Sequence, residues 1–304
     1  MSETSHMTGL RGDLRLDEPM ARHVSWRAGG VAKRIYSPAD AADLQTFLRV
    51  LPADEPIIFV GLGSNLLVRD GGYDGTIVLM HHSDAKIRAD GDLVWADAGA
   101  ASPKLARFSA THALEGGEFL AGVPGTVGGA LAMNAGCYGA ETWDVVARVQ
   151  TIDRRGQLHV RVPGDFELGY RHCVLHDALL GVDEWFVAGW FRFHAGDAAA
   201  ARARITEWLE RRVATQPLNL PNAGSVFRNP PGDHAARLIE SCGLKGFAIG
   251  GARIAEKHAN FIVNPGGAGS AADIEALIHH TQAVVAARTG ITLVPEVRII
   301  GVAA

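Results

Sequence analysis

The sequence predicts an α+β protein built from two or three lobes, and three observations lead to this fold class. The chain has 304 residues, which is more than one small core usually holds. Short apolar runs of strand length alternate with amphipathic stretches of helix length. Two glycine-rich segments, 61–65 and 118–139, interrupt this pattern and are poor material for either element, because glycine loses the most freedom on folding.

In the first third of the chain we expect a strand–helix–strand unit. A strand is predicted over 31–36, and a helix is predicted to start at Ser37-Pro38, with Ser37 as its N-cap, and to end before Pro52. A buried strand over 57–60 then leads into the first glycine loop. Strands over 66–68, 76–80 and 93–98 and a helix over 102–112 complete this part.

In the rest of the chain we expect a hairpin of strands over 145–153 and 158–162 and a long strand over 184–194. Helices are expected over 197–214, 234–242 and 271–288, and a final strand over 293–301. The helix over 197–214 has its apolar residues at amphipathic spacing. Gly243 is expected to end the following helix. Two prolines and no periodicity over 215–222 predict a domain junction there.

Composition excludes several classes of protein. Hydrophobic residues make up 47% and charged residues 20%, as in ordinary globular proteins. The net charge of −4 disfavours a nucleic-acid binder, which usually carries a basic surplus. Residues 1–16 are polar, so we expect no signal peptide. No stretch approaches the ~20 apolar residues that span a bilayer, so we expect a cytoplasmic protein without a membrane partner.

Neither a disulfide framework nor a metal site is expected. Cys137, Cys173 and Cys242 are few, odd in number and far apart, and no CxxC occurs. The 13 histidines include adjacent pairs but no HExxH, and neighbours in a chain rarely face one site.

The two glycine-rich loops together predict a bound nucleotide-like cofactor. The loop at 61–65, Gly-Leu-Gly-Ser-Asn, is not GxGxxG and precedes a strand, so a Rossmann site is unsupported and a simple turn remains an alternative. In the second loop, Pro124 fixes one backbone angle and Gly125-Thr126 is expected to open a helix whose N-terminus faces an anion. Gly128 and Gly129 would then permit close approach.

Four further motifs join the two loops: Gly-Tyr-Arg at 169–171, Ala-Gly-Ser-Val-Phe-Arg-Asn-Pro at 223–230, Glu-Lys-His-Ala-Asn-Phe-Ile-Val-Asn at 256–264 and Val-Pro-Glu-Val-Arg at 294–298. In this order they resemble the UDP-N-acetylenolpyruvoylglucosamine reductase family, over about residues 22–301. Together these motifs are highly specific, although each alone is not. The family makes UDP-N-acetylmuramate for bacterial peptidoglycan.

The resemblance implies a fold and a domain plan. It implies an α+β chain with a FAD-binding domain of the vanillyl-alcohol-oxidase and carbon-monoxide-dehydrogenase flavoprotein type, followed by an α+β substrate-binding domain. We expect an N-terminal segment over 1–20, the FAD-binding domain over 21–196 with subdomains of about 21–80 and 81–196, and the substrate-binding domain over 197–304. Ser225 and Glu296 are 71 positions apart, which suggests the shorter form without an extra tyrosine-bearing loop. Trp26, Cys137 and Cys173 depart from the family's usual residues.

The resemblance also implies tightly but non-covalently held FAD, with NADPH as co-substrate and UDP-N-acetylglucosamine enolpyruvate as substrate. The expected FAD contacts come from both glycine-rich segments: Gly61, Gly63, Ser64, Asn65, Leu66, Gly122, Pro124, Gly125, Thr126, Gly128, Gly129, Ala130, Asn134 and Gly136. A monomer is expected, with an oligomer left open.

Three residues are expected to carry the reaction, in which hydride reaches the substrate's C3 and an enolate develops at C2 and its carboxylate. Arg171 would supply a fixed positive charge that binds the carboxylate in a two-pronged geometry, unless it is a surface arginine after a turn. Ser225 would give the proton to C2, unless it is a serine of a polar loop. Glu296 would help to stabilise the enol form, unless it pairs with Arg298; donating a hydrogen bond would require burial to raise its pKa.

Substrate contacts are expected from four residues around these motifs: Tyr170, Arg228, Asn229 and Lys257. Asn229 resembles the family residue that contacts the substrate's diphosphate. Ordinary turn and surface roles are the alternatives for all four.

Two other functions compete with the reductase. An FAD-linked oxidase of the same fold would leave the serine, arginine and glutamate without a shared purpose. A non-catalytic protein that binds FAD or a UDP-sugar would bind without turnover, and the intact Arg171, Ser225 and Glu296 argue against it.

Overall fold

The computed structural model of the chain describes residues 9–82 and 84–304, which form two compact units that alternate along the sequence. Unit 1 holds residues 9–16, 34–61 and 75–210 of the described chain, and unit 2 holds 17–33, 62–74 and 211–304. Residues 1–8 of the predicted N-terminal segment lie outside the described part. The predicted domain boundaries after residues 20 and 196 stay predictions.

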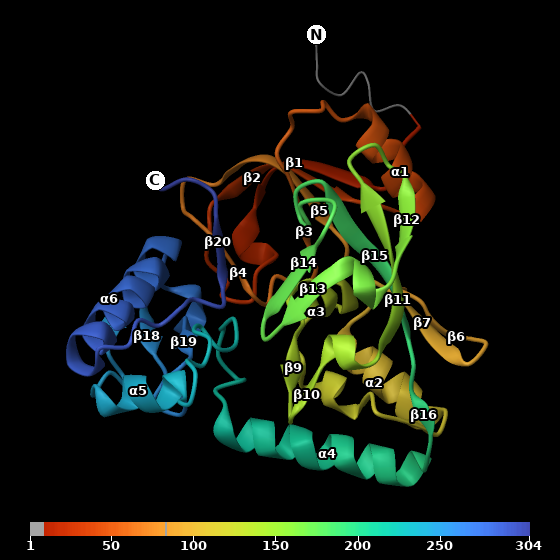
Figure 1. The fold of residues 1–304 in the computed structure, drawn as a ribbon. Helices are drawn as coiled ribbons and strands as arrows, with labels where there is room; N and C mark the ends of the chain where they lie inside the picture. The colour runs from red at the N-terminus through yellow and green to blue at the C-terminus, as the bar shows by residue number, and fades with distance from the viewer. Residues whose placement is uncertain (1–8, 83) are drawn as a thin grey trace. The chain divides into compact units, whose positions relative to one another are not determined.

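The main sheet of unit 1 is antiparallel and has the order β12-β11-β15-β7-β6 (Figure 1). Its strands are β6 (Ile87–Asp90), β7 (Leu93–Asp97), β11 (Val146–Asp153), β12 (Leu158–Arg161) and β15 (Glu184–Phe191). All eight residues of β15 are buried, as expected of a central strand covered on both faces. The predicted hairpin is confirmed, since β11 and β12 pair in antiparallel fashion from Ile152↔Leu158 to Val149↔Arg161.

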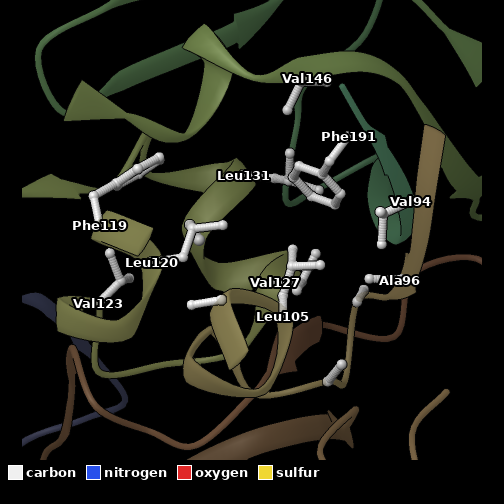
Figure 2. Packing of buried hydrophobic residues seen from close by; sticks show 14 of the residues in the cluster. Val94, Ala96, Leu105, Phe119, Leu120, Val123, Val127, Leu131, Val146 and Phe191 are labelled. Carbon is white, nitrogen blue, oxygen red and sulfur yellow. The ribbon is translucent and has the colours of Figure 1, made fainter. Parts of the chain in front are cut away.

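The core of unit 1 lies where two helices pack against this sheet. They are α2 (Ser102–Thr111) and α3 (Val127–Ala132). Figure 2 shows Val127 and Leu131 of α3 in one apolar cluster with Leu105 of α2 and Phe191 of β15. The glycine-rich segment is therefore fixed to the sheet by the few large apolar side chains that it carries.

A second sheet has the order β1-β2-β5-β3, from β1 (Asp13–Pro19), β2 (Val31–Ser37), β3 (Ile57–Val60) and β5 (Tyr73–Leu79). In unit 1, β3 pairs in parallel with β5 and α1 (Ala41–Val50) joins β2 to β3. The order β2, α1, β3 along the chain confirms the predicted strand–helix–strand unit, with β5 lying between β2 and β3 in the sheet. The stacked rings of Tyr36 and Phe47, 3.9 Å apart, hold α1 in place.

Short elements complete unit 1. Its two-stranded ladders are β8 (Leu114–Glu115) with β16 (His194–Ala195), β9 (Gly136–Cys137) with β10 (Ala140–Glu141), and β13 (Phe166–Gly169) with β14 (His172–Leu175). The 3₁₀ turns of the described chain are Met20–Arg22, Glu118–Gly122, Thr142–Asp144, Pro163–Asp165 and Pro265–Gly267. The predicted long strand over 184–194 is thus two strands, since β15 ends at Phe191 and β16 pairs elsewhere.

Unit 2 has its own core between two helices and short strands. Its helices are α5 (Ala235–Ser241) and α6 (Ala271–Thr289), and its strands are β4 (Leu66–Val68), β17 (Ala248–Ile249), β18 (Ala252–Ile254), β19 (Ile262–Val263) and β20 (Arg298–Ile300). Figure 1 shows α6 alongside β18. Trp26 is fully buried there and its Nε1 donates to the Ile262 carbonyl at 2.7 Å, so this departure from the family pattern is a structural residue.

The helix α4 (Ala198–Thr215) carries the chain across the division between the units, which falls after Glu210. The predicted helix over 197–214 is confirmed. Its last five residues and the stretch 216–222 belong to unit 2.

The predicted start of the first helix was wrong. Ser37 ends β2, and α1 begins at Ala41 with Asp40 as its N-cap. The Asp40 carboxylate accepts from the Asp43 N–H at 2.9 Å, and Asp43 in turn accepts from the Ala39 N–H at 2.9 Å. Two aspartates satisfy the helix end three residues later than the Ser-Pro pair would.

The predicted final strand was too long. Of 293–301, only Arg298–Ile300 pairs as a strand, in parallel with β4. Pro295 has no N–H to donate, and it forms one isolated bridge to Phe227 instead.

Candidate active site

The two glycine-rich loops meet in unit 1. Gly61 follows the last residue of β3. A β-carbon at that position would overlap the Thr126 hydroxyl of the second loop. Only glycine therefore fits at Gly61 without displacing Thr126. Sequence could suggest two loops for one ligand, and the fold places these two residues in contact.

The helix α3 begins where the sequence predicts, but two amides at its N-terminus are used within the protein. Thr126 is its N-cap, and the Gly129 N–H reaches the Thr126 hydroxyl at 3.4 Å. However, the N–H groups of Val127 and Gly128 donate to the carbonyls of Ala100 and Ala98, both at 2.8 Å. These two amides are satisfied within the protein, so the helix end does not present them to an anion.

Gly128 and Gly129 are glycine for different physical reasons. A β-carbon at Gly128 would lie 2.9 Å from the β-carbon of Ala98, so close packing explains that glycine. A β-carbon at Gly129 would meet only the Thr126 hydroxyl, at 3.7 Å. Gly129 is therefore the position in α3 where a ligand can approach bare backbone. The predicted FAD contacts carry no charged side chain, so nothing in the set repels a diphosphate and the residues fit the cofactor.

In unit 2, the rest of the first loop is tied to the strand that carries Glu296. The Asn65 side chain donates to the Glu296 carbonyl at 3.1 Å, and the Asn65 carbonyl accepts from the Arg298 N–H at 3.0 Å. Gly63 has φ of +60°, and a β-carbon there would overlap the His23 carbonyl. A predicted cofactor loop and a predicted catalytic strand are thus neighbours, although 231 positions separate Asn65 from Glu296.

The segments of Ser225 and Glu296 lie side by side in unit 2. The Glu296 N–H donates to the Val226 carbonyl at 2.7 Å, and the Arg228 N–H donates to the Val294 carbonyl at 2.9 Å. Ser225 and Glu296 are both half-buried. Phe227 is buried to 2% exposure and anchors the segment. Two of the three candidate catalytic residues are therefore brought together by backbone pairing.

Asn260 is a further residue of this site that sequence reasoning missed. Its side-chain oxygen accepts from the Phe227 N–H at 3.0 Å, and its side-chain nitrogen donates to the Phe227 carbonyl at 2.8 Å. Its own carbonyl accepts from the Val226 N–H at 2.9 Å. The Asn260 side chain thus makes with Phe227 the pair of backbone hydrogen bonds that a neighbouring strand would make, two residues after Ser225. Its place in the 256–264 motif was the available signal.

Arg171 occupies the turn between β13 and β14 in unit 1, with φ of +53°. Its guanidinium donates from Nη2 to the Gly136 carbonyl at 2.9 Å and from Nη1 to the Asn134 carbonyl at 3.3 Å. Its carbon lies 4.9 Å from the centre of the Tyr170 ring. The side chain is only 15% exposed, which does not fit the alternative of a surface arginine.

The side chain of Asn134 does not lie open to a cofactor. Its nitrogen donates to Glu141 Oε2 at 2.8 Å and to the Gly169 carbonyl at 3.0 Å, and its oxygen accepts from the Trp143 N–H at 3.1 Å. Both amide hydrogens and the carbonyl oxygen are therefore in use. The FAD contact expected of Asn134 stays a prediction for its backbone alone.

The four expected substrate contacts are in different situations. Tyr170 is 46% exposed. Arg228 has a buried Nε without a hydrogen-bond partner in the described chain, which a bound anion would satisfy. Asn229 accepts from the Ala235 N–H at 3.1 Å, and Lys257 donates to the Val213 carbonyl at 2.6 Å. The last two already hold the start of α5 and the end of α4.

The three cysteines are free thiols, and Cys173 lies beside Arg171 in the chain. Burial raises the pKa of the Cys173 thiol to about 12, with a smaller opposing effect from Trp143. The thiol is therefore protonated at neutral pH and a poor nucleophile.

Within residues 9–82 and 84–304 there is no group of three or more histidine, cysteine, aspartate or glutamate side chains that would hold a metal ion. In the same ranges no helix has both the length and the apolar character to cross a bilayer.

Comparison with known proteins identifies the class first. A family model described as an FAD binding domain matches residues 32–161, which include β3, the Gly61 loop and the whole of α3. The chain is thus an FAD-binding flavoprotein. A second model, described as UDP-N-acetylenolpyruvoylglucosamine reductase, C-terminal domain, matches residues 216–300, which include Ser225, Asn260 and Glu296.

Whole-chain relatives agree with both models. The UDP-N-acetylenolpyruvoylglucosamine reductase of Thiobacillus denitrificans is 58% identical over 306 residues, covering 96% of this chain and 93% of the relative. The protein of the same name from Nitrosospira multiformis is 56% identical over 315 residues, covering 96% and 90%. The crystal structure of UDP-N-acetylenolpyruvylglucosamine reductase from Thermus caldophilus matches with a TM-score of 0.76 and 28% identity, covering 95% of this chain and 99% of that one.

The chain belongs to the UDP-N-acetylenolpyruvoylglucosamine reductase family and is an oxidoreductase. The predicted resemblance is confirmed. The predicted α+β fold class with a FAD-binding domain is confirmed as well, and the C-terminal family model matches the region that follows it.

Proposed function

We propose that this chain reduces UDP-N-acetylglucosamine enolpyruvate to UDP-N-acetylmuramate with NADPH, for peptidoglycan precursor synthesis. The observation that carries the proposal is the 58% identity to a reductase of that name across nearly the full length of both chains. The arginine, serine and glutamate that the reaction needs are all present.

The two glycine-rich segments would hold FAD, and the bound cofactor would supply hydride transfer from NADPH to C3 of the enolpyruvyl group. The chain's own residues must then hold the enolate and protonate it. Ser225 gives its hydroxyl proton to C2, so that hydride and proton together saturate the double bond. A serine hydroxyl is a weak acid, and it serves here because an enolate carbon is strongly basic. The two hydrogen bonds between the Asn260 side chain and the Phe227 backbone, and the Glu296–Val226 hydrogen bond, support this role. They fix the backbone around Ser225.

Arg171 binds the substrate carboxylate and stabilises the enolate that develops beside it. Glu296 assists in stabilising the enol form and its protonation. Support for Arg171 comes from its low exposure and from the two carbonyls that fix its guanidinium. A charged group held in place before reaction stabilises a developing charge better than a mobile one, because nothing must reorganise.

FAD would be held by backbone groups of the two glycine-rich segments, around Gly61, Thr126 and Gly129 and over residues 63–66. Arg228 is the strongest candidate for the substrate's diphosphate, because its buried Nε lacks a partner in the described chain. Tyr170 would contact the substrate beside Arg171. Asn229 and Lys257 would act only if the substrate replaces or extends their present hydrogen bonds.

The test follows the two half-reactions separately. The bound flavin is reduced anaerobically with NADPH, UDP-N-acetylglucosamine enolpyruvate is added, and flavin absorbance is followed in a stopped-flow instrument. Rapid reoxidation by the sugar is expected. A flavin that reoxidises only with oxygen would favour an FAD-linked oxidase, and a flavin that NADPH does not reduce would favour a binding protein.

The role of Arg171 has its own test. Replacing Arg171→Ala should slow sugar-dependent reoxidation much more than it lowers FAD content. Purification of an apoprotein would show that the arginine is structural instead.

We further propose that the protein acts in the cytoplasm as a monomer, without a nucleic-acid or membrane partner. Light scattering after size-exclusion chromatography of the yellow holoenzyme tests the monomer, and a mass of two chains would reject it.

A further inference from the structure

We infer that Asn134 and Glu141 are positioning residues that set the orientation of the Arg171 guanidinium. This inference rests on the proposed function, in which Arg171 binds the substrate carboxylate. It assigns Asn134 a role different from cofactor binding and adds Glu141, which no sequence motif singled out. All of the groups involved lie in unit 1.

One short stretch of backbone accepts two hydrogen bonds from the guanidinium. The accepting carbonyls belong to Asn134, in the turn after α3, and to Gly136, the first residue of β9. Asn134 has φ of +39°, a left-handed conformation that asparagine tolerates better than most residues. The direction in which the Asn134 carbonyl points therefore depends on how this unusual backbone conformation is maintained.

The Asn134 side chain maintains it from three sides. Its oxygen accepts from the Trp143 N–H. Its nitrogen donates to the Glu141 carboxylate at the end of β10 and to the Gly169 carbonyl at the end of β13. The last bond reaches the strand that leads directly into Arg171. Asn134 thus joins the turn that accepts from the guanidinium to the hairpin that carries it, at 3% exposure. Such a satisfied buried polar network specifies a single arrangement.

Glu141 acts on both members of this arrangement. Its Oε2 accepts from the Asn134 side chain at 2.8 Å, and its Oε1 lies 4.0 Å from Arg171 Nη1. A separation of 4.0 Å is outside hydrogen-bond distance, so the carboxylate attracts the guanidinium without forming the forked pair that a substrate carboxylate would form. Glu141 therefore biases the orientation of Arg171 through charge and fixes Asn134 through a hydrogen bond.

A double-mutant cycle tests this inference. Glu141→Gln keeps the size and an oxygen acceptor for Asn134 but removes the charge beside Arg171. We expect it to slow sugar-dependent reoxidation of the pre-reduced holoenzyme by roughly 10- to 100-fold. The reason is that a shift of about 1 Å in the group that orients a substrate can cost up to about 100-fold in rate. FAD content and flavin reduction by NADPH should stay within about twofold of wild type, since neither needs the substrate carboxylate.

The decisive comparison is made in the Arg171→Ala background. If Glu141 acts through Arg171, adding Glu141→Gln to Arg171→Ala should cause no further loss. The matched control is Glu167→Gln, which removes a 70% exposed carboxylate from the same β13–β14 hairpin where it pairs with His172. The control should reoxidise at the wild-type rate. The dissociation constant of UDP-N-acetylmuramate, measured by calorimetry, should rise in Glu141→Gln and not in Glu167→Gln.

Each outcome decides between the inference and its alternatives. Losses that add in the double variant, or a loss of FAD content in Glu141→Gln equal to its loss of rate, would make Glu141 a structural residue and overturn the inference. Asn134→Ala is expected to behave like Glu141→Gln if it folds, and the Glu141 cycle stands without it. A wild-type enzyme that the sugar does not reoxidise would instead reject the proposed function, before any variant is compared, and the inference with it.

Discussion

Asn260→Ala is the substitution that should separate local order at Ser225 from general stability. The Asn260 side chain exchanges two hydrogen bonds with the backbone of Phe227, at 3.0 and 2.8 Å, in a position only 3% exposed. Alanine removes both partners at once and leaves the Phe227 N–H and carbonyl unpaired in a site that water reaches poorly.

The size of the effect follows from these two groups. A buried polar group that loses its partner destabilises by about 1–3 kcal/mol, so two of them predict a loss of roughly 2–6 kcal/mol in the free energy of unfolding. An unfolding entropy of about 2.1 cal/mol/K per residue over 304 residues corresponds to roughly 1.6 °C per kcal/mol, so Tm should fall by roughly 3–9 °C. Because the freed backbone carries Ser225, sugar-dependent reoxidation should fall further than the folded fraction explains.

The matched control is Asn264→Ala. Asn264 is fully buried and its side chain makes an equivalent set of bonds, to the carbonyls of Trp26 and Gly269 and from the Gly269 N–H, and none of these three bonds goes to the Ser225 segment. Thermal unfolding and stopped-flow reoxidation are measured for both variants. Equal loss of stability with a selective loss of rate in Asn260→Ala is expected. If both variants lose rate equally, or if Asn260→Ala retains wild-type stability, the reasoning is refuted.

Three other predictions concern the second glycine loop, the proton donor and the acid stability of the sheet. Gly129→Ala should raise the unfolding free energy of the apoprotein by roughly 0.5–1 kcal/mol, because alanine is the better helix former and its β-carbon has room, yet it should lower FAD retention; unchanged FAD content would show that Gly129 is not a cofactor contact. Ser225→Ala should leave flavin reduction by NADPH near normal and slow sugar reduction by roughly 10²–10⁴-fold, whereas equal losses in both half-reactions would reject the proton-donor role. Burial acts to raise the pKa of Glu184, but its bonds from Arg161, at 2.8 and 3.0 Å, and from Thr151 outweigh burial and hold that pKa below its ordinary value. The ionised Glu184 therefore stabilises the fold fully above the unfolded pKa of about 4.3, and this contribution is lost as pH falls through the lower folded pKa. The urea midpoints of wild type and Glu184→Gln should differ at pH 7 and approach each other as the pH falls below the unfolded pKa of about 4.3; a constant difference would contradict this assignment.

Sequence reasoning was most reliable where local chemistry decides the structure. The amphipathic period placed α4 within one residue at each end, and the turn residues 154–157 gave the β11–β12 hairpin. It failed where a distant partner or a competing cap intervened. Asp40 and Asp43 displaced Ser37 from the start of α1, and the pairing of β20 with β4 is limited to Arg298–Ile300 because Pro295 bridges Phe227 instead.

The candidate site divides in the same way. Residue types and motif order were enough to select Arg171, Ser225 and Glu296 and the two glycine loops, because each motif is contiguous in the chain and its chemistry belongs to its side chains. The sequence held no information about which groups those residues meet. The hydrogen bonds of Asn260 with Phe227, and those that link Glu141, Asn134 and Arg171, join separate parts of the chain. Asn260 stands in the 256–264 motif, but that motif does not indicate its partner.

The sequence by itself determined the family, the fold class, most elements and the chemical groups available for reaction. Only the tertiary structure decided that the Val127 and Gly128 amides are satisfied internally, that Gly128 is needed for packing against Ala98, and that Asn134 faces Glu141 and Gly169. The physical reason is that a hydrogen-bond donor has several acceptors open to it in the unfolded chain. Which of them it takes is fixed when burial removes water and every polar group must find a partner within reach.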